Sequence, residues 1–364
     1  MTIQQVIQLL EEWTPTAYAE DFDNVGLLVG DKQNTVTNIL VAHDSLEGTL
    51  DEAIAKDCNL IVCFHPIIFS GLKRLTGSSY VERVVIKAIK HDIAIYAIHT
   101  ALDNVMHGVN HGMCHALGIQ DCSILIPKKN HIHELTTYVP IAATATVQDA
   151  LSKAGAGQIG NYDSCSFTVE GKGTFKALSG ANPTSGTLGE RHSEAEIMIH
   201  VTYEKQLEGK ILTALHQAHP YEEVAYEITS LNNTHPYLGM GMIGVLPESM
   251  NESDFLNLVK RTFKTGGIRH SAFLGKEVKK VAVLGGSGAF AIKAARRQGA
   301  QVLLTADLKY HDFYKAEKDI LVADIGHYES ERFTKNIIAE YLTKKIRNFA
   351  VILSEENTNP INYL

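Results

Sequence analysis

The chain has 364 residues, of which 45% are hydrophobic and 20% are charged. These proportions are typical of a folded globular protein and exclude wholesale disorder and fibrous repeats, and at about 150 residues per domain the length predicts two or three domains. Thirty-three basic residues against 41 acidic ones give a net charge of −8, which argues against a protein that mainly binds nucleic acid.

Neither the hydropathy nor the cysteine content indicates a membrane or secreted protein. No apolar run reaches the length of about 18 residues that a membrane helix needs. Residues 1–13 predict an amphipathic helix and lack the basic and then apolar segments of a signal peptide. The five cysteines form no CxxC pair and are expected to be reduced thiols. We therefore expect a cytoplasmic protein without membrane contact.

The N-terminal part of the chain alternates between short apolar segments and amphipathic helices. This alternation is typical of parallel strands that are buried on both faces. The opening helix is followed by strands expected over 37–44, 59–64 and 92–100, and by helices over 46–56, 81–91 and 104–117. The same pattern returns near the C-terminus, with strands over 278–286, 300–307, 319–326 and 348–354, and helices over 289–298, 309–317 and 329–345.

The middle of the chain differs from both ends in its composition and its sequence pattern. It contains polar strands over 134–140 and 196–203, a glycine-rich segment over 155–167 and a turn-rich segment over 179–194. We interpret it as a compact α+β domain inserted into one α/β unit. The expected division is therefore 1–127 and 233–364 for the two halves of the α/β core, and 128–232 for the insertion.

Three clusters of polar residues directly follow apolar strands of the core. They are His65, then His99 with Asp103, and finally Asp324, His327 and Glu331. Loops at the carboxyl ends of parallel strands converge on one crevice, and the i, i+4 spacing of His327 and Glu331 lets both face one point. Imidazole and carboxylate together suit Zn²⁺, Mn²⁺, Fe²⁺ or Ni²⁺. The pattern favours a metal site, although each histidine alone could be an ordinary loop or core residue.

A glycine-rich turn at 286–291 offers a different interpretation. Gly286, Gly288 and Ala291 follow a strand and precede a helix, and Asp307 lies about twenty positions further on, as in dinucleotide-binding proteins. A nicotinamide-dependent oxidoreductase is therefore a third reading of the chain. Since this fingerprint is short, a tight strand-to-helix turn without a ligand is the favoured interpretation.

Six blocks of the sequence carry a family resemblance. They are FDNVGLLVG (22–30), HPIIFSG (65–71), IYAIHTALDN (95–104), GVN (108–110), TADLKYHD (305–312) and DIGHYESE (324–331). In this order they resemble the signature blocks of the Nif-three-like family, whose members are often labelled GTP cyclohydrolase 1 type 2 homologs. The middle segment is similar to the CutA/PII-like insertion of the longer bacterial members. The resemblance implies a layered α/β core with an inserted ferredoxin-like α+β domain, and assembly into a ring-like homohexamer.

The resemblance also implies one or two divalent metal ions, held by His65, Asp103, His327 and Glu331. The family usually has histidine immediately before His65, where this chain has Phe64, so one imidazole is missing. His99 and His311 are candidates for that role, and Cys63 is a weaker one. His99 and His311 are also expected to shuttle protons or to orient the ligands during catalysis.

The implied activity is metal-dependent hydrolysis of a nucleotide or another phosphate-bearing small molecule, because a bridged metal pair can lower the pKa of a shared water. The alternative is a regulatory or scaffold protein with structural metals, in which the insertion senses a ligand.

Overall fold

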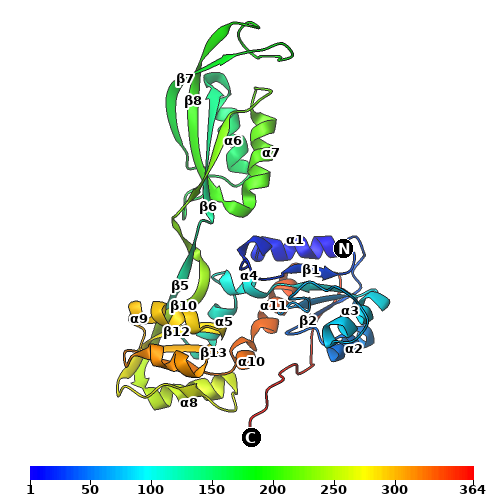
Figure 1. Cartoon of the computed structure of the whole chain (residues 1–364), viewed down its shortest axis with the longest axis vertical. Coiled ribbons are helices and arrows are strands. Elements are labelled where there is room, and N and C mark those ends of the chain that lie inside the picture. Colours follow the sequence, from blue (N-terminus) through cyan, green and yellow to red (C-terminus); the bar gives the residue numbers. More distant parts are fainter. The chain divides into compact units, whose positions relative to one another are not determined.

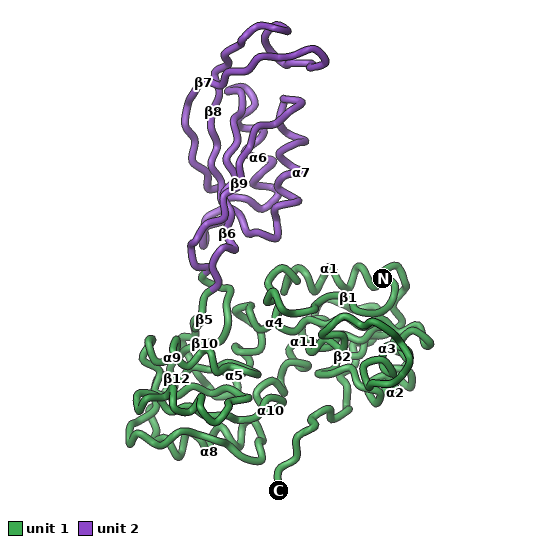
Figure 2. Tube along the Cα trace, in the orientation of Figure 1, with its two compact units in different colours: residues 1–127, 236–364 green, residues 128–235 purple.

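The computed structural model describes residues 1–364, which fold into two compact units (Figure 2). Residues 1–127 and 236–364 together form unit 1, and residues 128–235 form unit 2. The chain contains three β-sheets and eleven α-helices, so the predicted mixed α/β class is confirmed. None of the helices combines the length and the apolar character that crossing a membrane requires.

The first sheet of unit 1 has five strands in the order β1-β4-β3-β2-β15. The last four are parallel, and β1 is antiparallel at the edge. Strands β1 and β2 of this sheet are labelled in Figure 1. Helices α1 and α11 cover one face, and α2 and α3 cover the other, which explains the continuous apolar runs of the central strands. The elements are α1 (Ile3–Trp13), β1 (Gly26–Val29), β2 (Ile39–Ala42), α2 (Glu47–Ala55), β3 (Leu60–Cys63), α3 (Tyr80–Lys90), β4 (Ala94–Ala97), α4 (His99–Asn104), α11 (Thr334–Lys345) and β15 (Val351–Leu353).

The second sheet of unit 1 has six strands in the order β11-β14-β13-β12-β10-β5. Strands β12, β13 and β14 are parallel, and β10 and β11 pair antiparallel with their neighbours. Helices α5 and α8 pack against one face, and α9 packs against the other. The elements are α5 (Val109–Leu117), β5 (Gln120–Lys129), β10 (Thr234–Asn251), α8 (Glu252–Phe263), β11 (Arg269–His270), β12 (Glu277–Ser287), α9 (Ile292–Arg297), β13 (Val302–Ala306), β14 (Leu321–Asp324) and α10 (His327–Glu331).

Two C-terminal segments differ from a simple continuation of the βα repeat. The strand expected over 348–354 forms β15, which joins the first sheet and places Val351 opposite Ile39 of β2. The helix expected over 309–317 is a 3₁₀ helix over Tyr310–Ala316. The C-terminal segment therefore ties the two halves of unit 1 together, since it crosses from the second sheet to the first.

Unit 2 is a four-stranded antiparallel sheet with two helices. Its elements follow in the order β-α-β-β-α-β, and the strands lie in the order β7-β8-β6-β9. Strand β6 alternates between buried and half-buried positions, because one face of the sheet packs on the helices. The elements are β6 (Ile132–Pro140), α6 (Thr144–Lys153), β7 (Phe167–Lys176), β8 (Arg191–Glu204), α7 (Glu208–Ala218) and β9 (Tyr226–Leu231).

Candidate metal centre

Histidine and acidic side chains follow the carboxyl ends of neighbouring parallel strands in both sheets of unit 1. In the first sheet they follow β2, β3 and β4, and in the second sheet they follow β13 and β14. In chain order these residues are His43, Asp44, His65, His99, Asp103, Asp307, His327 and Glu331. Strand ends of both sheets thus supply one cluster, as expected for ligand sites of parallel sheets.

One oxygen of Glu331 lies at the middle of this cluster. Its Oε2 atom is 3.3 Å from Nε2 of His65, 3.3 Å from Nε2 of His327 and 3.5 Å from Nε2 of His43. Two ligand atoms that share one tetrahedral ion, each about 2.1 Å from it, lie about 3.4 Å apart. The observed spacings are therefore compatible with a ligand set around a cation, as well as with ion pairs between Glu331 and the imidazoles.

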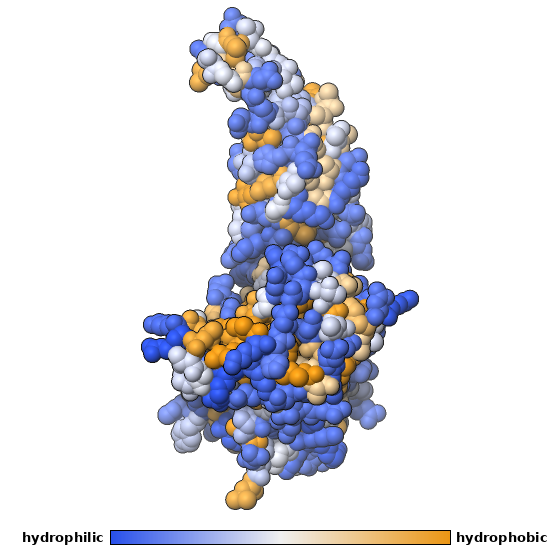
Figure 3. Space-filling model, turned by 90° about the vertical axis from the view of Figure 1, so that its right-hand side faces the viewer, coloured by the Kyte–Doolittle hydropathy of each residue, from blue (hydrophilic) through white to orange (hydrophobic).

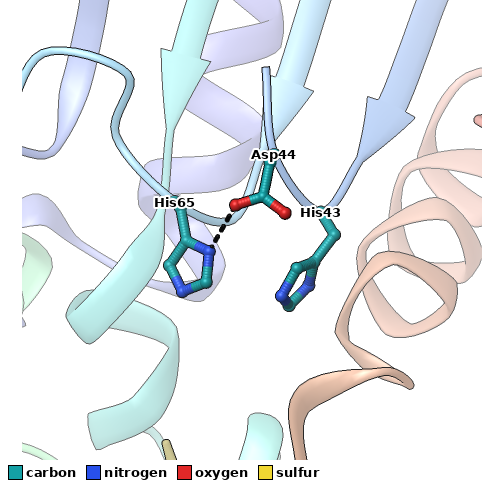
Figure 4. Close-up of side chains that lie close together, drawn as sticks. All are labelled: His43, Asp44 and His65. Atoms are coloured by element: carbon teal, nitrogen blue, oxygen red, sulfur yellow. Dashed lines mark hydrogen bonds and ion pairs between the residues drawn. The ribbon is translucent and has the colours of Figure 1, made fainter. Parts of the chain in front are cut away.

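The ligand atoms fall into two overlapping groups. In each group the atoms lie within 4.8 Å of one another: one group is His65, His327 and Glu331, and the other is His43, Asp44 and His65. Figure 4 shows the second group, in which the rings of His43 and His65 come from the ends of β2 and β3. His65 belongs to both groups, so the geometry offers room for one ion or for two neighbouring ions.

Three aspartates fix the orientation of three histidines. Asp44 accepts a hydrogen bond from Nδ1 of His65 at 2.7 Å, and Asp307 accepts one from Nδ1 of His327 at 2.7 Å. Nδ1 of His99 donates in the same way to Oδ1 of Asp23 at 2.8 Å. A carboxylate on one ring nitrogen leaves the other nitrogen as the ligand or proton acceptor, which is the usual support of a metal-binding histidine.

The electrostatics of the cluster follow from burial and from these contacts. Burial opposes the charged imidazole of His65, but its contacts with Asp44 and Glu331 outweigh burial and raise its pKa to about 9. Burial is likewise outweighed at His327, where Asp307 and Glu331 raise the pKa to about 11. Burial, together with the neighbouring His65, instead lowers the pKa of His43 to about 4. His43 is therefore a neutral imidazole at neutral pH, whereas His65 and His327 carry protons.

Two buried carboxylate oxygens of the cluster, Oε2 of Glu331 and Oδ1 of Asp103, accept no hydrogen bond of normal geometry. Burial, and then the charge of Glu331, raise the pKa of Asp103 well above its usual value. Burial would also raise the pKa of Glu331, but the facing imidazoles of His327 and His65 hold it well below its usual range. A buried acid is costly unless a positive charge compensates it, and the imidazoles of His65 and His327, each 3.3 Å from Glu331, supply that charge in the metal-free chain.

Only some of the predicted site residues lie together in the structure. It brings His65, His327 and Glu331 together, and it places Asp103 within electrostatic range of them, outside the two close groups. The ring of His99 lies beside His65, with centroids 5.1 Å apart. His311 is exposed and packs against Tyr310 and Tyr314, and no contact joins it to the cluster.

Cys63 also lies apart from the ligand atoms. It is fully buried, and its thiol donates to the backbone carbonyls of His65 and Tyr96.

The glycine turn at 286–288 serves the cluster by close packing. A Cβ atom on Gly286 would lie 2.4 Å from Oε1 of Glu331, and a Cβ on Gly288 would lie 2.1 Å from Oγ1 of Thr305. The backbone N–H of Gly286 donates to Ser330 at 2.9 Å. Asp307, the acidic residue of the dinucleotide-like pattern, accepts a hydrogen bond from Nδ1 of His327. These contacts account for both glycines and for the aspartate without a dinucleotide.

The sequence did not reveal His43, Asp44, Asp23 or the contact of Asp307 with His327 as parts of the site. A signal for the first two was present, because His43 and Asp44 directly follow the apolar strand 39–42, as the predicted residues follow theirs. The aspartate partners of His65, His99 and His327 lie 20 or more residues away in the chain, so no local sequence pattern predicts these pairs.

Comparison with known proteins decides the family. The sequence matches the Duf34/NIF3 (NGG1p interacting factor 3) family over residues 1–360. The chain belongs to this family. A Bacillus subtilis relative named GTP cyclohydrolase 1 type 2 homolog is 39% identical over 99% of this chain and 98% of its own, and a Staphylococcus aureus relative of the same name is 33% identical over the full length of both.

Solved structures support the Duf34/NIF3 assignment. A Bacillus cereus protein related to NIF3 covers 100% of this chain and 99% of its own, with a TM-score of 0.84 and 35% identity. A Staphylococcus aureus protein covers the same shares, with a TM-score of 0.77 and 29% identity. The predicted resemblance to the Nif-three-like family is thereby confirmed over the whole chain.

Proposed function

We propose that this cluster binds one or two divalent cations, chosen from Zn²⁺, Mn²⁺, Fe²⁺ and Ni²⁺, and that the protein is a metal-dependent hydrolase. The proposed ligands are His65, Asp103, His327 and Glu331. The observation that carries the proposal is Oε2 of Glu331, a buried oxygen that accepts no normal hydrogen bond and faces three imidazole nitrogens at 3.3–3.5 Å. Mixed nitrogen and oxygen ligands suit these borderline ions.

The chemistry at such a site would depend on a few residues with separate tasks. A divalent ion, when bound, lowers the pKa of a coordinated water and polarises a carbonyl or phosphoryl oxygen. His99 is placed to accept a proton at Nε2, because Asp23 occupies its Nδ1 atom and the ring lies beside His65. Asp44 and Asp307 keep Nε2 of His65 and of His327 directed at the centre. The second predicted proton shuttle, His311, has no contact through which to act on this cluster.

The substrate class that we propose is a nucleotide or another phosphate-bearing small molecule. Its support is the name of the relatives, GTP cyclohydrolase 1 type 2 homolog, together with a ligand set suited to phosphoryl or carbonyl activation.

Metal analysis tests the proposal first. Protein purified without chelators should carry a divalent ion, and Asp103→Ala and His327→Ala should each lose it while circular dichroism shows a folded chain. Background metal in the wild type after incubation with each of the four ions would refute the proposal. Turnover is tested next on a nucleotide panel: metal-dependent, saturable hydrolysis that Asp103→Ala abolishes supports the enzyme.

A second candidate function is a regulatory protein with structural metals, and one feature of unit 2 favours it. We propose that unit 2 is a ferredoxin-like, CutA/PII-like module, on the basis of its β-α-β-β-α-β order and its strand order. It contains a largely apolar cavity of about 630 Å³, lined by Val169, Phe175, Met198, Tyr138 and Tyr221 among others. Such a cavity is large enough for a small ligand. Metal-dependent stability without turnover on any nucleotide of the panel would favour this function.

We also propose that the chain forms a homohexamer, as the family resemblance implies. Figure 3 shows apolar side chains, in orange, gathered on one face of unit 1. Exposed apolar patches of this kind mark protein interfaces. Light scattering should give the mass of six chains, and a monomer mass would refute this part of the proposal.

A further inference from the structure

His43 has no role among the residues proposed above, yet its surroundings are unusual. The side chain is 4% exposed, and neither Nδ1 nor Nε2 has a hydrogen-bond partner. Buried polar groups nearly always have a partner, so an imidazole with two free nitrogens requires an explanation. Its Nε2 atom faces Oε2 of Glu331 at 3.5 Å, on the same oxygen that His65 and His327 approach.

The ring of His43 is held in place by packing. It stands edge-on to Tyr328 with centroids 5.1 Å apart, edge-on to His65 at 4.7 Å, and it lies 5.6 Å from the ring of Phe64. These contacts fix the ring without using its nitrogens. A rigid imidazole that packing aims at a buried carboxylate is suited to coordinate a cation.

Position 43 is also the neighbour of position 64 across the sheet. Strands β2 and β3 are parallel, and their register places Ala42 beside Cys63, so the next residues along, His43 and Phe64, end the strands together. The N–H of Phe64 donates to the carbonyl of Ala42 at 3.2 Å and to that of His43 at 3.1 Å. An imidazole at either position therefore starts from the same corner of the sheet.

The other candidates for the missing imidazole do not join the ligand atoms. His99 has its Nδ1 bound by Asp23, as His65 and His327 have theirs bound by aspartates, but it belongs to neither close group of ligand atoms. His311 is exposed beside two tyrosines, and the Cys63 thiol donates to backbone carbonyls. Of these side chains, only His43 joins a close group with His65.

We propose that His43 is a metal ligand and that it supplies, from the end of β2, the imidazole that Phe64 does not provide at the end of β3. This inference rests on the proposed metal site. It predicts a transposition of one ligand between adjacent strands: a histidine at position 64 should be able to replace the one at position 43, because both side chains start from the same corner.

The test compares four proteins: the wild type, His43→Leu, the double variant His43→Leu/Phe64→His, and the control His270→Leu. His270 is an exposed histidine outside the cluster, which stacks on Phe273 and has its Nδ1 atom on the backbone carbonyl of Ser271. Each protein is stripped with chelator and then titrated with Co²⁺, and the binding is followed by visible absorption and by metal analysis. Loss of a direct ligand should weaken binding at least as much as loss of its supporting partner does, which is about 10- to 100-fold.

The expected result is that His43→Leu loses one ion per chain or binds it at least about tenfold more weakly. The double variant should regain most of that affinity, and His270→Leu should match the wild type. If the wild type binds Co²⁺ and His43→Leu binds it equally well with the same spectrum, the inference is wrong while the proposed metal site stands.

The inference can still be tested if His43→Leu does not fold. In that case His43→Gln, which keeps a polar side chain, replaces it, and unchanged Co²⁺ affinity in this variant overturns the inference. A wild type that binds no Co²⁺ overturns the proposed metal site itself, and the inference with it. The two failures are therefore distinguishable in one titration series.

Discussion

The two aspartates that accept hydrogen bonds from His65 and His327 should contribute unequally to the affinity of the site for metal. Asp44 supports His65 and Asp307 supports His327, each through a hydrogen bond of 2.7 Å. The carboxylate of Asp44 is 24% exposed, whereas that of Asp307 is 51% exposed. Solvent screens the more exposed pair, so we expect Asp44→Asn to weaken metal binding more than Asp307→Asn does.

The magnitude follows from the kind of contact that is lost. Asparagine keeps an acceptor oxygen but removes the charge, and removal of such a partner typically costs 10- to 100-fold in metal affinity, which is about 1.4 to 2.7 kcal/mol. We place Asp307→Asn near the lower limit and Asp44→Asn near the upper one. Asparagine also tolerates the positive φ of +56° at position 307, so the backbone should not shift.

Isothermal titration calorimetry with one chosen ion at fixed pH measures both variants. Asp319→Asn is the matched control, because Asp319 is an exposed aspartate whose partner, Arg296, lies outside the cluster. Equal affinities of all three variants and the wild type would refute the reasoning. A larger loss in Asp307→Asn than in Asp44→Asn would show that solvent screening does not rank these contacts.

Four further outcomes are expected. Gly286→Ala should reduce metal content in metal analysis, because its Cβ would lie 2.4 Å from Glu331 and the position has a positive φ; an alanine variant with full metal content would contradict this packing argument. Metal affinity should rise with pH throughout the range below about pH 9 in calorimetric titrations, since His65 and His327 must lose their protons and their pKa values are about 9 and about 11. The His65 imidazolium stabilises the metal-free protein fully below about pH 6.5, and this stabilisation is lost as the pH rises to about 9. The melting temperature of the metal-free protein should therefore fall relative to that of the loaded protein between these two pH values, and a constant difference would be inconsistent with the raised pKa. His99→Ala should lower kcat of the proposed hydrolysis by about 10²- to 10⁴-fold while metal content stays constant, and an unchanged kcat would exclude His99 as the proton acceptor.

The parts of the fold that local patterns determine could be predicted. Short apolar runs between amphipathic helices indicated parallel strands buried on both faces, and β2, β3 and β4 are such strands. The sheet that each strand joins could not be predicted in the same way. The apolar run that forms β15 would look the same beside β14 as beside β2, because strand pairing is decided by tertiary contacts far along the chain.

Part of the candidate site could be predicted from one rule, which looks for polar residues directly after apolar strands. The residues to which this rule was not applied were missed. Polar residues directly after apolar strands led to His65, Asp103 and His327. The same rule points to His43, which a reading of 37–44 as a single strand obscured, because β2 ends at Ala42. The support that Asp23 gives to His99 connects residues 76 positions apart, and only the folded chain brings them together.

The charge balance of the cluster explains why a single buried carboxylate can organise it. Glu331 comes from the second sheet of unit 1, and His65 comes from the first, so their contact joins the two sheets. In the metal-free chain the imidazoles of His65 and His327 face Glu331 on one side and Asp44 or Asp307 on the other, so the pKa values of both histidines are raised and that of Glu331 is lowered. A divalent ion that replaced the two imidazole protons would bring the same charge to the same place. Metal binding would then leave the charge of the buried site unchanged, and the cation would connect residues that follow the two sheets, as the protonated imidazoles do.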